Sequence, residues 1–312
     1  MQSTKFFLRK IKWYIYKYIF RKSVILSKLN DFEMYLDLVT PGISKTLFVY
    51  KTREEDMIKV IKDEIRPGMT IIDCGSNIGF YPLLEAKILD GEGTIYAVEP
   101  DYRNFKLLEM NVTASKYNNT IKTFQIAMSN KSGSCEMFVA KQSNLNKLSS
   151  KDDSRFKNRH KVENTVLVKT ITIDDFIEQE NIEVDFIRMD IEGYEVEVFR
   201  GMKKLLNNVK SGFKIFLELH PHAYSDDRSF SEQLKYLFDR DFAPKLIISA
   251  GYGLDSGEER PKKFKDLGYI PSTSMESDGF IRDFYSNIKK EDVISLTCTE
   301  PKSSRYVLLE KC

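Results

Sequence analysis

Thr70-Ile-Ile-Asp-Cys-Gly-Ser-Asn-Ile-Gly79 is the stretch that decides how this chain of 312 residues folds. An apolar run ends on Asp73, Gly75 and Gly79 bracket a short turn, and Phe80–Leu89 continues with helical spacing. This pattern predicts a strand, a glycine loop and a helix. Glycine lets the backbone approach a bound molecule, and the first N–H groups of a helix attract a carboxylate or a phosphate. The stretch therefore predicts a ligand site at the end of the strand.

The spacing of the loop favours one ligand over another. A dinucleotide site has three glycines in the pattern G-x-G-x-x-G, whereas here two glycines lie four residues apart with Asn77 between them. Asp73 is placed to orient the methionine end of S-adenosylmethionine. A second apolar run ends in Glu99, where a carboxylate can accept both ribose hydroxyls. The alternative is an ordinary turn in which the glycines only relieve backbone strain.

The charge of the chain is unevenly distributed. Residues 1–30 contain eight basic side chains and no acid, so the other residues carry 40 basic against 46 acidic side chains. An acidic body argues against nucleic acid as a partner, because nucleic-acid binding needs a basic stripe on the folded domain. Four cysteines without a CxxC pair favour a reducing compartment, and we expect a cytoplasmic protein.

Residues 1–30 are predicted to form a basic amphipathic helix. Lysines and arginines face away from an apolar stripe of Phe7, Leu8, Ile11, Tyr14, Ile15, Tyr18 and Ile19. The segment lacks the ~20 apolar residues needed to span a bilayer and the apolar core of a signal peptide. The stripe either packs on the domain, as a lid or a dimer contact, or lies on an anionic membrane surface. The second alternative would place the protein on the inner face of the membrane.

Polar side chains follow two further predicted strands. Val184–Met189 leads to Asp190 and Glu192, and Phe213–Leu219 ends in Glu218 and His220. Ligands bind open α/β sheets at the carboxyl ends of their strands, so we expect these groups beside the glycine loop. Ala127 ends the predicted strand Thr120–Ala127 and is expected to border the adenine ring.

These motifs resemble the FkbM family of S-adenosylmethionine-dependent methyltransferases. The stretches that match span roughly residues 70–222 in the family's order: Ile71–Tyr81, Tyr96–Asp101, Asn104–Leu108 with Asn111, Thr172–Asp175, Asp185–Glu195 and Leu217–His220. The most selective of them is the strand end Asp190-Ile-Glu-Gly-Tyr-Glu195. Arg188 stands where the family usually has lysine, and the resemblance covers neither the N-terminal basic helix nor residues 251–300.

The resemblance implies an α/β fold of the class I methyltransferase type. This is a Rossmann-like three-layer sandwich around a seven-stranded, mostly parallel sheet with an antiparallel last strand. It also implies O-methylation of a hydroxyl, often on a sugar or a glycan. The residues expected to bind the donor S-adenosylmethionine are Asp73, Gly75, Asn77, Gly79, Glu99, Ala127 and Asp190.

The chain is expected to divide into five parts. They are the helix of residues 1–30, an N-terminal access or lid region over 31–69, the methyltransferase core over 70–250, a cap over the acceptor pocket at 251–300, and the last core strand at 301–312. In the cap, aromatic residues either stack on a sugar or anchor the cap to the core. Two strands, Pro244–Ala250 and Arg305–Glu310, are predicted to pair and form the antiparallel edge of the sheet. A polar loop, Ser143–Glu163, which contains His160, is predicted to close over the substrate.

A hydroxyl is a poor nucleophile and needs a base or a metal ion. His220 or Glu192 is expected to take its proton close to Asp190, and a neutral imidazole is the better base near pH 7. Alternatively, Asp190, Glu218 and His220 hold a divalent Mg or Mn ion that acidifies the hydroxyl; we favour the metal-free version.

Two other functions remain open at this point. One is O-methylation of an RNA ribose, which the acidic body disfavours, or of another small molecule. The other is a membrane-associated adaptor that keeps the fold without catalysis, and the intact set of Asp73, Gly75, Gly79 and Glu99 argues against it.

Overall fold

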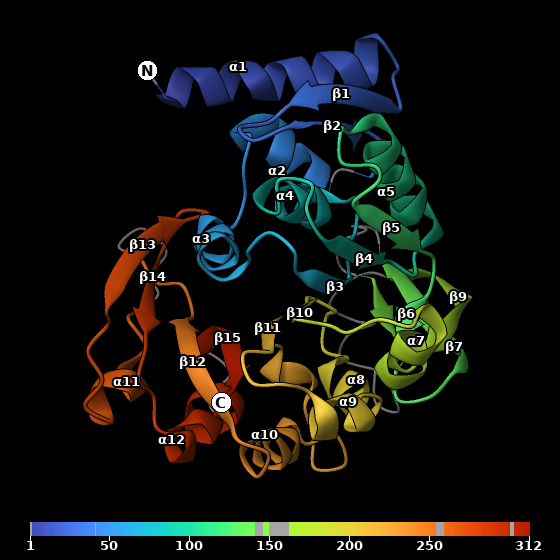
Figure 1. Ribbon diagram of the computed structural model, residues 1–312. Helices are drawn as coiled ribbons and strands as arrows, with labels where there is room; N and C mark the ends of the chain where they lie inside the picture. Colours follow the sequence, from blue (N-terminus) through green and yellow to red (C-terminus); the bar gives the residue numbers. More distant parts are fainter. Residues whose placement is uncertain (1, 41, 141–145, 150–161, 254–258, 300–302) are drawn as a thin grey trace.

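The computed structural model describes residues 2–40, 42–140, 146–149, 162–253, 259–299 and 303–312 (Figure 1). Its largest element is a mixed sheet with the strand order β13-β14-β12-β15-β11-β10-β3-β4-β5. In this order the strands are Thr273–Ser277, Phe280–Tyr285, Phe242–Ser249, Ser304–Lys311, Lys214–Glu218, Phe186–Met189, Thr70–Cys74, Thr94–Val98 and Ile121–Phe124. The strands from β11 to β5 are parallel to one another, and β15 is antiparallel to both of its neighbours.

Helices cover both faces of this sheet. Successive side chains of a strand point to opposite sides, so Ile71 of β3 belongs to one hydrophobic core and Ile72 to the other. The first core includes α2 (Gly42–Tyr50), α3 (Glu55–Glu64), α4 (Phe80–Ile88) and α5 (Tyr102–Ala114). The second includes α7 (Ile173–Glu180), α8 (Glu195–Arg200), α9 (Lys203–Asn208) and α10 (Phe230–Phe238). The expected α/β architecture with three layers is therefore present (Figure 1).

The predicted count of seven strands is wrong, because the sheet has nine within the described residues. β12 and β15 pair in antiparallel fashion as expected, but they are not the edge. Residues expected to form a cap supply β14, which pairs with β12 and covers its free hydrogen-bonding groups, and β13, which becomes the edge strand. Phe264 of α11 (Lys262–Asp266) stacks on Tyr285 with 3.9 Å between ring centroids, and both rings are buried in the second hydrophobic core, so they anchor the segment there.

A second, smaller sheet lies next to the first, with the order β6-β9-β7-β8. Its strands are Ala127–Met128, Val162–Ile171, Gly133–Ala140 and Lys147–Leu148. Lys147–Leu148 falls within the predicted loop Ser143–Glu163 and pairs with β7. Most of that loop, His160 included, lies outside the described residues.

The N-terminal helix is present as α1 (Gln2–Tyr14), which continues into the π-helical turn η1 (Ile15–Ile19). The β-hairpin of β1 (Val24–Lys28) and β2 (Glu33–Asp37) follows it. Trp13 is fully buried and packs edge-on against Phe48 of α2, with 5.3 Å between ring centroids. The predicted stripe itself does not pack on the domain, because most of its residues lie on the other side of the helix. No helix within the described ranges combines the length and apolar character needed to cross a membrane.

Candidate active site

A cavity of about 360 Å³ opens where β3, β4, β10 and β11 end. The segments that follow these strands form its walls, and they include Asn77, Glu99, Asp190 and His220. The volume lies in the range of small-molecule sites in proteins. The carboxyl ends of four neighbouring strands thus meet at one cavity, as expected for an open α/β sheet.

The glycine loop is shaped by its neighbouring strands. Gly75 lines the cavity and has φ of 83°, and a Cβ atom there would lie 2.0 Å from the backbone oxygen of Asp190. Gly79 has φ of 93°, packs against Leu108, and is not among the residues that line the cavity. Both positions require glycine. Because Gly75 has no side chain, the glycine loop can lie directly against the backbone at the end of β10.

The N–H groups of the loop are already used within the protein. Those of Gly75 and Ser76 donate to the carbonyl of Val98, and that of Asn77 donates to Oε2 of Glu99 at 2.9 Å. The N–H groups of the next two residues bond to Asn77 and Ser76. The N–H groups of residues 75–79 are therefore not free for an anionic ligand.

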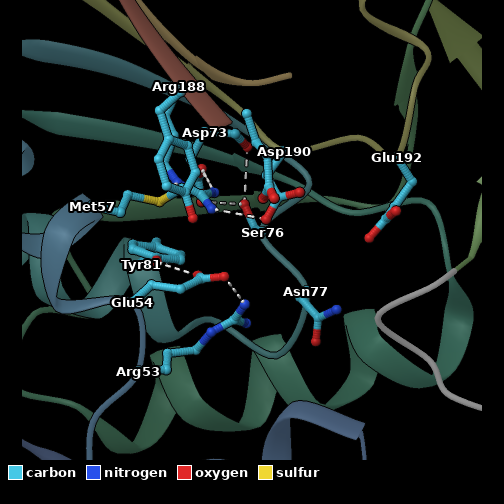
Figure 2. Close-up of polar contacts among 12 residues, drawn as sticks. Arg53, Glu54, Met57, Asp73, Ser76, Asn77, Tyr81, Arg188, Asp190 and Glu192 are labelled. Atoms are coloured by element: carbon cyan, nitrogen blue, oxygen red, sulfur yellow. Dashed lines mark hydrogen bonds and ion pairs between the residues drawn. The ribbon is translucent and has the colours of Figure 1, made fainter. Parts of the chain in front are cut away.

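Asp73 is the main departure from the expected site. Its side chain is completely buried and is not part of the cavity wall. Oδ1 accepts a hydrogen bond from Nη1 of Arg188 at 2.6 Å, and Oδ2 accepts one from the hydroxyl of Ser76 at 2.9 Å (Figure 2). Asp73 therefore balances the charge of a buried guanidinium. It does not reach the cavity, where the sequence analysis expected it to contact the ligand.

Arg188 occupies the space between this carboxylate and the cavity. Its guanidinium lies 3.7 Å from the centroid of the Tyr81 ring, and Nη2 lies 3.3 Å from Oδ2 of Asp190 (Figure 2). An arginine can bridge two carboxylates in this way because its planar group presents several donors. Arg188, which stands where the family usually has lysine, thus links Asp73 to Asp190.

Glu99 and Asn77 lie in the cavity wall, as predicted. Glu99 accepts the N–H groups of Asn77 and Asp101, each at 2.9 Å. Burial raises the pKa of Glu99 to about 8, despite these hydrogen bonds. Ala127 also lines the cavity, beside the apolar side chains of Met128 and Leu148. A carboxylate and a flat apolar wall at one end of a cavity fit a ribose and an aromatic base.

Asn146 was missed by the sequence analysis, because nothing distinguishes it within a polar stretch. Its Oδ1 accepts the N–H of Ala140 at 2.9 Å, and the residue lines the same end of the cavity. Its Nδ2 is buried and has no hydrogen-bond partner among the described residues. A buried amide donor without a partner is costly, and a ring nitrogen of adenine would satisfy it. These residues fit the adenosine part of S-adenosylmethionine.

The opposite end of the cavity gathers carboxylates around His220. Its Nδ1 lies 2.8 Å from Oε1 of the fully buried Glu195, and its Nε2 lies 3.6 Å from Oε2 of Glu192. Glu195 holds the ring so that Nε2 faces Glu192 and the cavity. Asp190 and Glu218 complete the wall at this end.

The charge state of His220 differs from the expectation. Burial alone would lower the pKa of His220, but Glu195, and then Glu192 and Glu218, raise it to about 10. This direction favours the imidazolium near neutral pH and argues against His220 as a neutral base. Burial raises the pKa of Glu192 to about 8 and that of Glu218 to about 7.

The three residues considered for a metal ion do lie together. One ligand atom from each of Asp190, Glu218 and His220 falls within 4.8 Å of the others. Each group already has a charged partner: Arg188 for Asp190, Arg305 for Glu218 at 3.1 Å, and Glu195 for His220. A divalent ion would compete with these pairs for the same atoms.

The N-terminal region adds a cationic group that the sequence did not reveal. Nη2 of Arg53 lies 2.6 Å from Oε1 of Glu54, whose other oxygen accepts the hydroxyl of Tyr81 at 2.6 Å (Figure 2). Burial opposes the ionised form of Glu54, but Arg53 and Arg305 lower its pKa to about 2. Among the described residues, the other guanidinium nitrogens of Arg53 have no hydrogen-bond partner.

A second cavity of about 1120 Å³ adjoins the first at Ile43 and Arg53. It lies below α1, whose Lys5 and Arg9 line it together with Asp278. Residues 251–300, expected to cap the acceptor pocket, contribute no described residue to the first cavity. Their contribution to the second is Glu276 of β13 and the turn after that strand.

Comparison with known proteins places the chain among methyltransferases. The methyltransferase FkbM domain matches residues 73–244, more than half of the chain. The hexuronic acid methyltransferase AglP of Haloferax volcanii is 26% identical over 170 residues, which are 54% of this chain and 62% of AglP. The match thus spans less than two thirds of that relative.

Two solved structures were compared as well. A methyltransferase FkbM from Methylobacillus flagellatus KT has 18% identity and a TM-score of 0.39, with 58% of this chain and 40% of that one covered. An S-adenosylmethionine-dependent O-methyltransferase from Thermotoga maritima has 13% identity and a TM-score of 0.40, with 94% and 80% covered. Both scores lie below 0.5, and the family assignment depends on the sequence match.

Proposed function

The chain belongs to the FkbM family of methyltransferases, and on this premise we propose that it transfers a methyl group from S-adenosylmethionine to a hydroxyl of a sugar or glycan. The observation that supports the proposal most is the composition of the cavity. One end fits an adenosine, and the other end holds a buried group of carboxylates around an imidazolium. The hexuronic acid methyltransferase of Haloferax volcanii supports a sugar as the acceptor.

Three residues are proposed to bind the nucleoside part of the donor, and a fourth positions one of them. Glu99 accepts the ribose hydroxyls, with its carboxylate held in place by the N–H groups of Asn77 and Asp101. Ala127 contacts the base, and Nδ2 of Asn146 donates to one of its ring nitrogens. Asn77 acts through its backbone, because its N–H orients Glu99.

Arg53 is proposed to bind the methionine carboxylate. The loop N–H groups are occupied and Asp73 is turned away, so the carboxylate needs another partner in the cavity wall. Arg53 has unused donors there, and a charge-assisted hydrogen bond to a carboxylate is among the strongest in proteins. Glu54 fixes the guanidinium from behind at 2.6 Å.

The bound donor supplies a methyl group that is activated by the positive charge on sulfur. The carboxyl groups of Asp190, Glu192 and Glu218 surround the end of the cavity where a cation would be stabilised, and Glu192 and Glu218 gain their negative charge as the pH rises through about 8 and about 7. We propose Glu192 as the base that takes the proton of the acceptor hydroxyl. Its pKa of about 8 lies near the working pH, whereas His220 already carries its proton. The imidazolium, held by Glu195, attracts the carboxylate of Glu192 and keeps it at the cavity.

The acceptor is proposed to enter from the second cavity. That cavity adjoins the donor cavity at Arg53 and is large enough for more than one sugar ring. Its wall combines basic and acidic groups, such as Arg9 and Asp278, which can hydrogen-bond sugar hydroxyls.

Two measurements test the proposed function. Isothermal titration calorimetry of the full chain with S-adenosylmethionine is expected to show binding at a single site, and no detectable binding would refute the enzyme. Mass spectrometry of surface polysaccharide and small glycans, from cells with and without the gene, is expected to show the loss of one methyl increment. If S-adenosylmethionine binds but the only product found is methylated RNA, the sugar acceptor is wrong and the alternative of ribose methylation holds.

A further inference from the structure

The N-terminal helix has two apolar sides, and the domain uses only one. Trp13 is buried, and Phe6 lies 5.0 Å from Tyr50 between ring centroids, so this side attaches α1 to α2. The other side is the predicted stripe. At 3.6 residues per turn, Phe7, Leu8 and Ile11 fall on the side of α1 away from Trp13.

Large apolar side chains are exposed along this outer side. We define the outer stripe by exposure as seven residues that are 41 to 70% exposed: Phe7, Leu8, Ile11 and Tyr14 of α1, Tyr18 and Ile19 of η1, and Phe20 directly after it. They account for almost half of the exposed large apolar side chains in the described residues, although they lie within 14 consecutive positions. An exposed apolar group of this density marks an interaction surface.

The charges around the stripe limit what can bind there. Lys10, Lys12, Arg21 and Lys22 are exposed next to it, and residues 1–30 contain no acid. Two copies of the chain that joined through this side would bring these cations together, which is unfavourable. An anionic surface would be complementary to them.

We propose that the outer stripe binds the surface of an anionic lipid bilayer, with α1 and η1 parallel to the membrane plane. Helices of this kind bury their apolar side at the level of the headgroups, where lysines reach anionic lipid and tyrosines favour the interface. Figure 1 shows α1 at one end of the molecule. The second cavity lies below the inner side of the same helix, so membrane binding would leave it uncovered.

The test uses the full chain and sedimentation with lipid vesicles. Binding is expected to vesicles of phosphatidylcholine with roughly one third phosphatidylglycerol, and to be much weaker with phosphatidylcholine alone. The variant Phe7→Ser/Leu8→Ser/Ile11→Ser should lower the partition coefficient at least about 100-fold, because three apolar side chains no longer enter the bilayer. A matched control is Leu167→Ser/Ile270→Ser, which changes two side chains that are even more exposed but lie outside the stripe.

A variant with fewer lysines separates the electrostatic contribution to membrane binding from the contribution of the apolar side chains. Each lysine near an anionic surface is worth about fivefold in binding, so Lys10→Gln/Lys12→Gln should weaken it roughly 25-fold. All variants should unfold at the temperature of the wild type and bind S-adenosylmethionine normally, because the exchanged side chains are exposed. The proposal is overturned if the wild type does not bind the anionic vesicles, if it binds neutral vesicles equally, or if the triple variant binds as well as the control. A wild-type dimer that the triple variant loses, without vesicle binding, would assign the stripe to a second copy.

Discussion

Replacing Asp73 by Asn removes one charge from a buried ion pair and keeps the size of the side chain. The carboxylate lies 2.6 Å from Nη1 of Arg188, and the two side chains are 0% and 1% exposed. After the replacement, the guanidinium keeps one ionic partner, Asp190, at 3.3 Å and 17% exposed. The variant Asp73→Asn therefore leaves a buried positive charge that is only partly balanced.

The magnitude follows from the cost of breaking a buried pair. Removing one partner typically lowers the free energy of unfolding by about 3–5 kcal/mol. Because Asp190 still compensates part of the charge, we expect about 3 kcal/mol, which corresponds to a fall of roughly 6–12 °C in the unfolding midpoint. Affinity for S-adenosylmethionine should stay within about threefold of the wild type, because Asp73 is not part of the cavity wall.

Differential scanning calorimetry gives the midpoint, and titration calorimetry at a temperature where the variant is folded gives the affinity. A second variant, Asp73→Asn/Arg188→Met, serves as the control. It removes the unbalanced charge together with its cause, so it should regain at least half of the lost stability. If Asp73→Asn instead unfolds at the wild-type temperature and binds S-adenosylmethionine more than tenfold more weakly, Asp73 contacts the donor and the reasoning is refuted.

The other predictions concern the proposed site and the N-terminal helix. Glu192→Gln should slow methyl transfer at least about 100-fold, and it should abolish the rise in rate that the wild type shows as pH increases through about 8, where Glu192 loses its proton; an unchanged pH profile would exclude Glu192 as the base. Arg53→Ala should weaken donor binding at least about tenfold in calorimetry, whereas Arg66→Ala, which changes an arginine outside both cavities, should not. Trp13→Ala should lower the free energy of unfolding by about 3–5 kcal/mol in urea, and a loss below about 1 kcal/mol would mean that α1 is not anchored by this residue. Removal of divalent ions with a chelator should leave the transfer rate unchanged; a loss that Mn restores would favour the metal alternative at Asp190, Glu218 and His220.

Most of the central fold was predictable, because it depends on local patterns. Short apolar runs followed by Gly75 and Gly79, or by Glu99, indicate buried parallel strands joined to helices, and β3, β4 and β10 are found where these runs lie. The two strands β13 and β14 were not predicted. The sequence of β13 is mostly polar and Gly279 separates the two strands, and they form because the edge of β12 is there for β14 to pair with.

The composition of the site was predictable only in part. The strand ends placed Glu99, Asp190 and His220 in one cavity, since parallel strands end on the same side of a sheet. A residue's position at a strand end does not tell which way its side chain points. Asp73 turns toward Arg188, and Glu195 and Arg53 reach the site from elements whose packing no local pattern describes.

The sequence by itself determined which strands end in acids, that the N-terminus forms a basic helix, and to which family the chain belongs, because these properties follow from residue type and spacing. Only the tertiary structure decided which acids face the cavity, that His220 is charged at neutral pH, and which side of the helix stays exposed. Those outcomes depend on burial and on neighbours brought together from distant parts of the chain. The electrostatics of buried groups are set by such neighbours and not by sequence position.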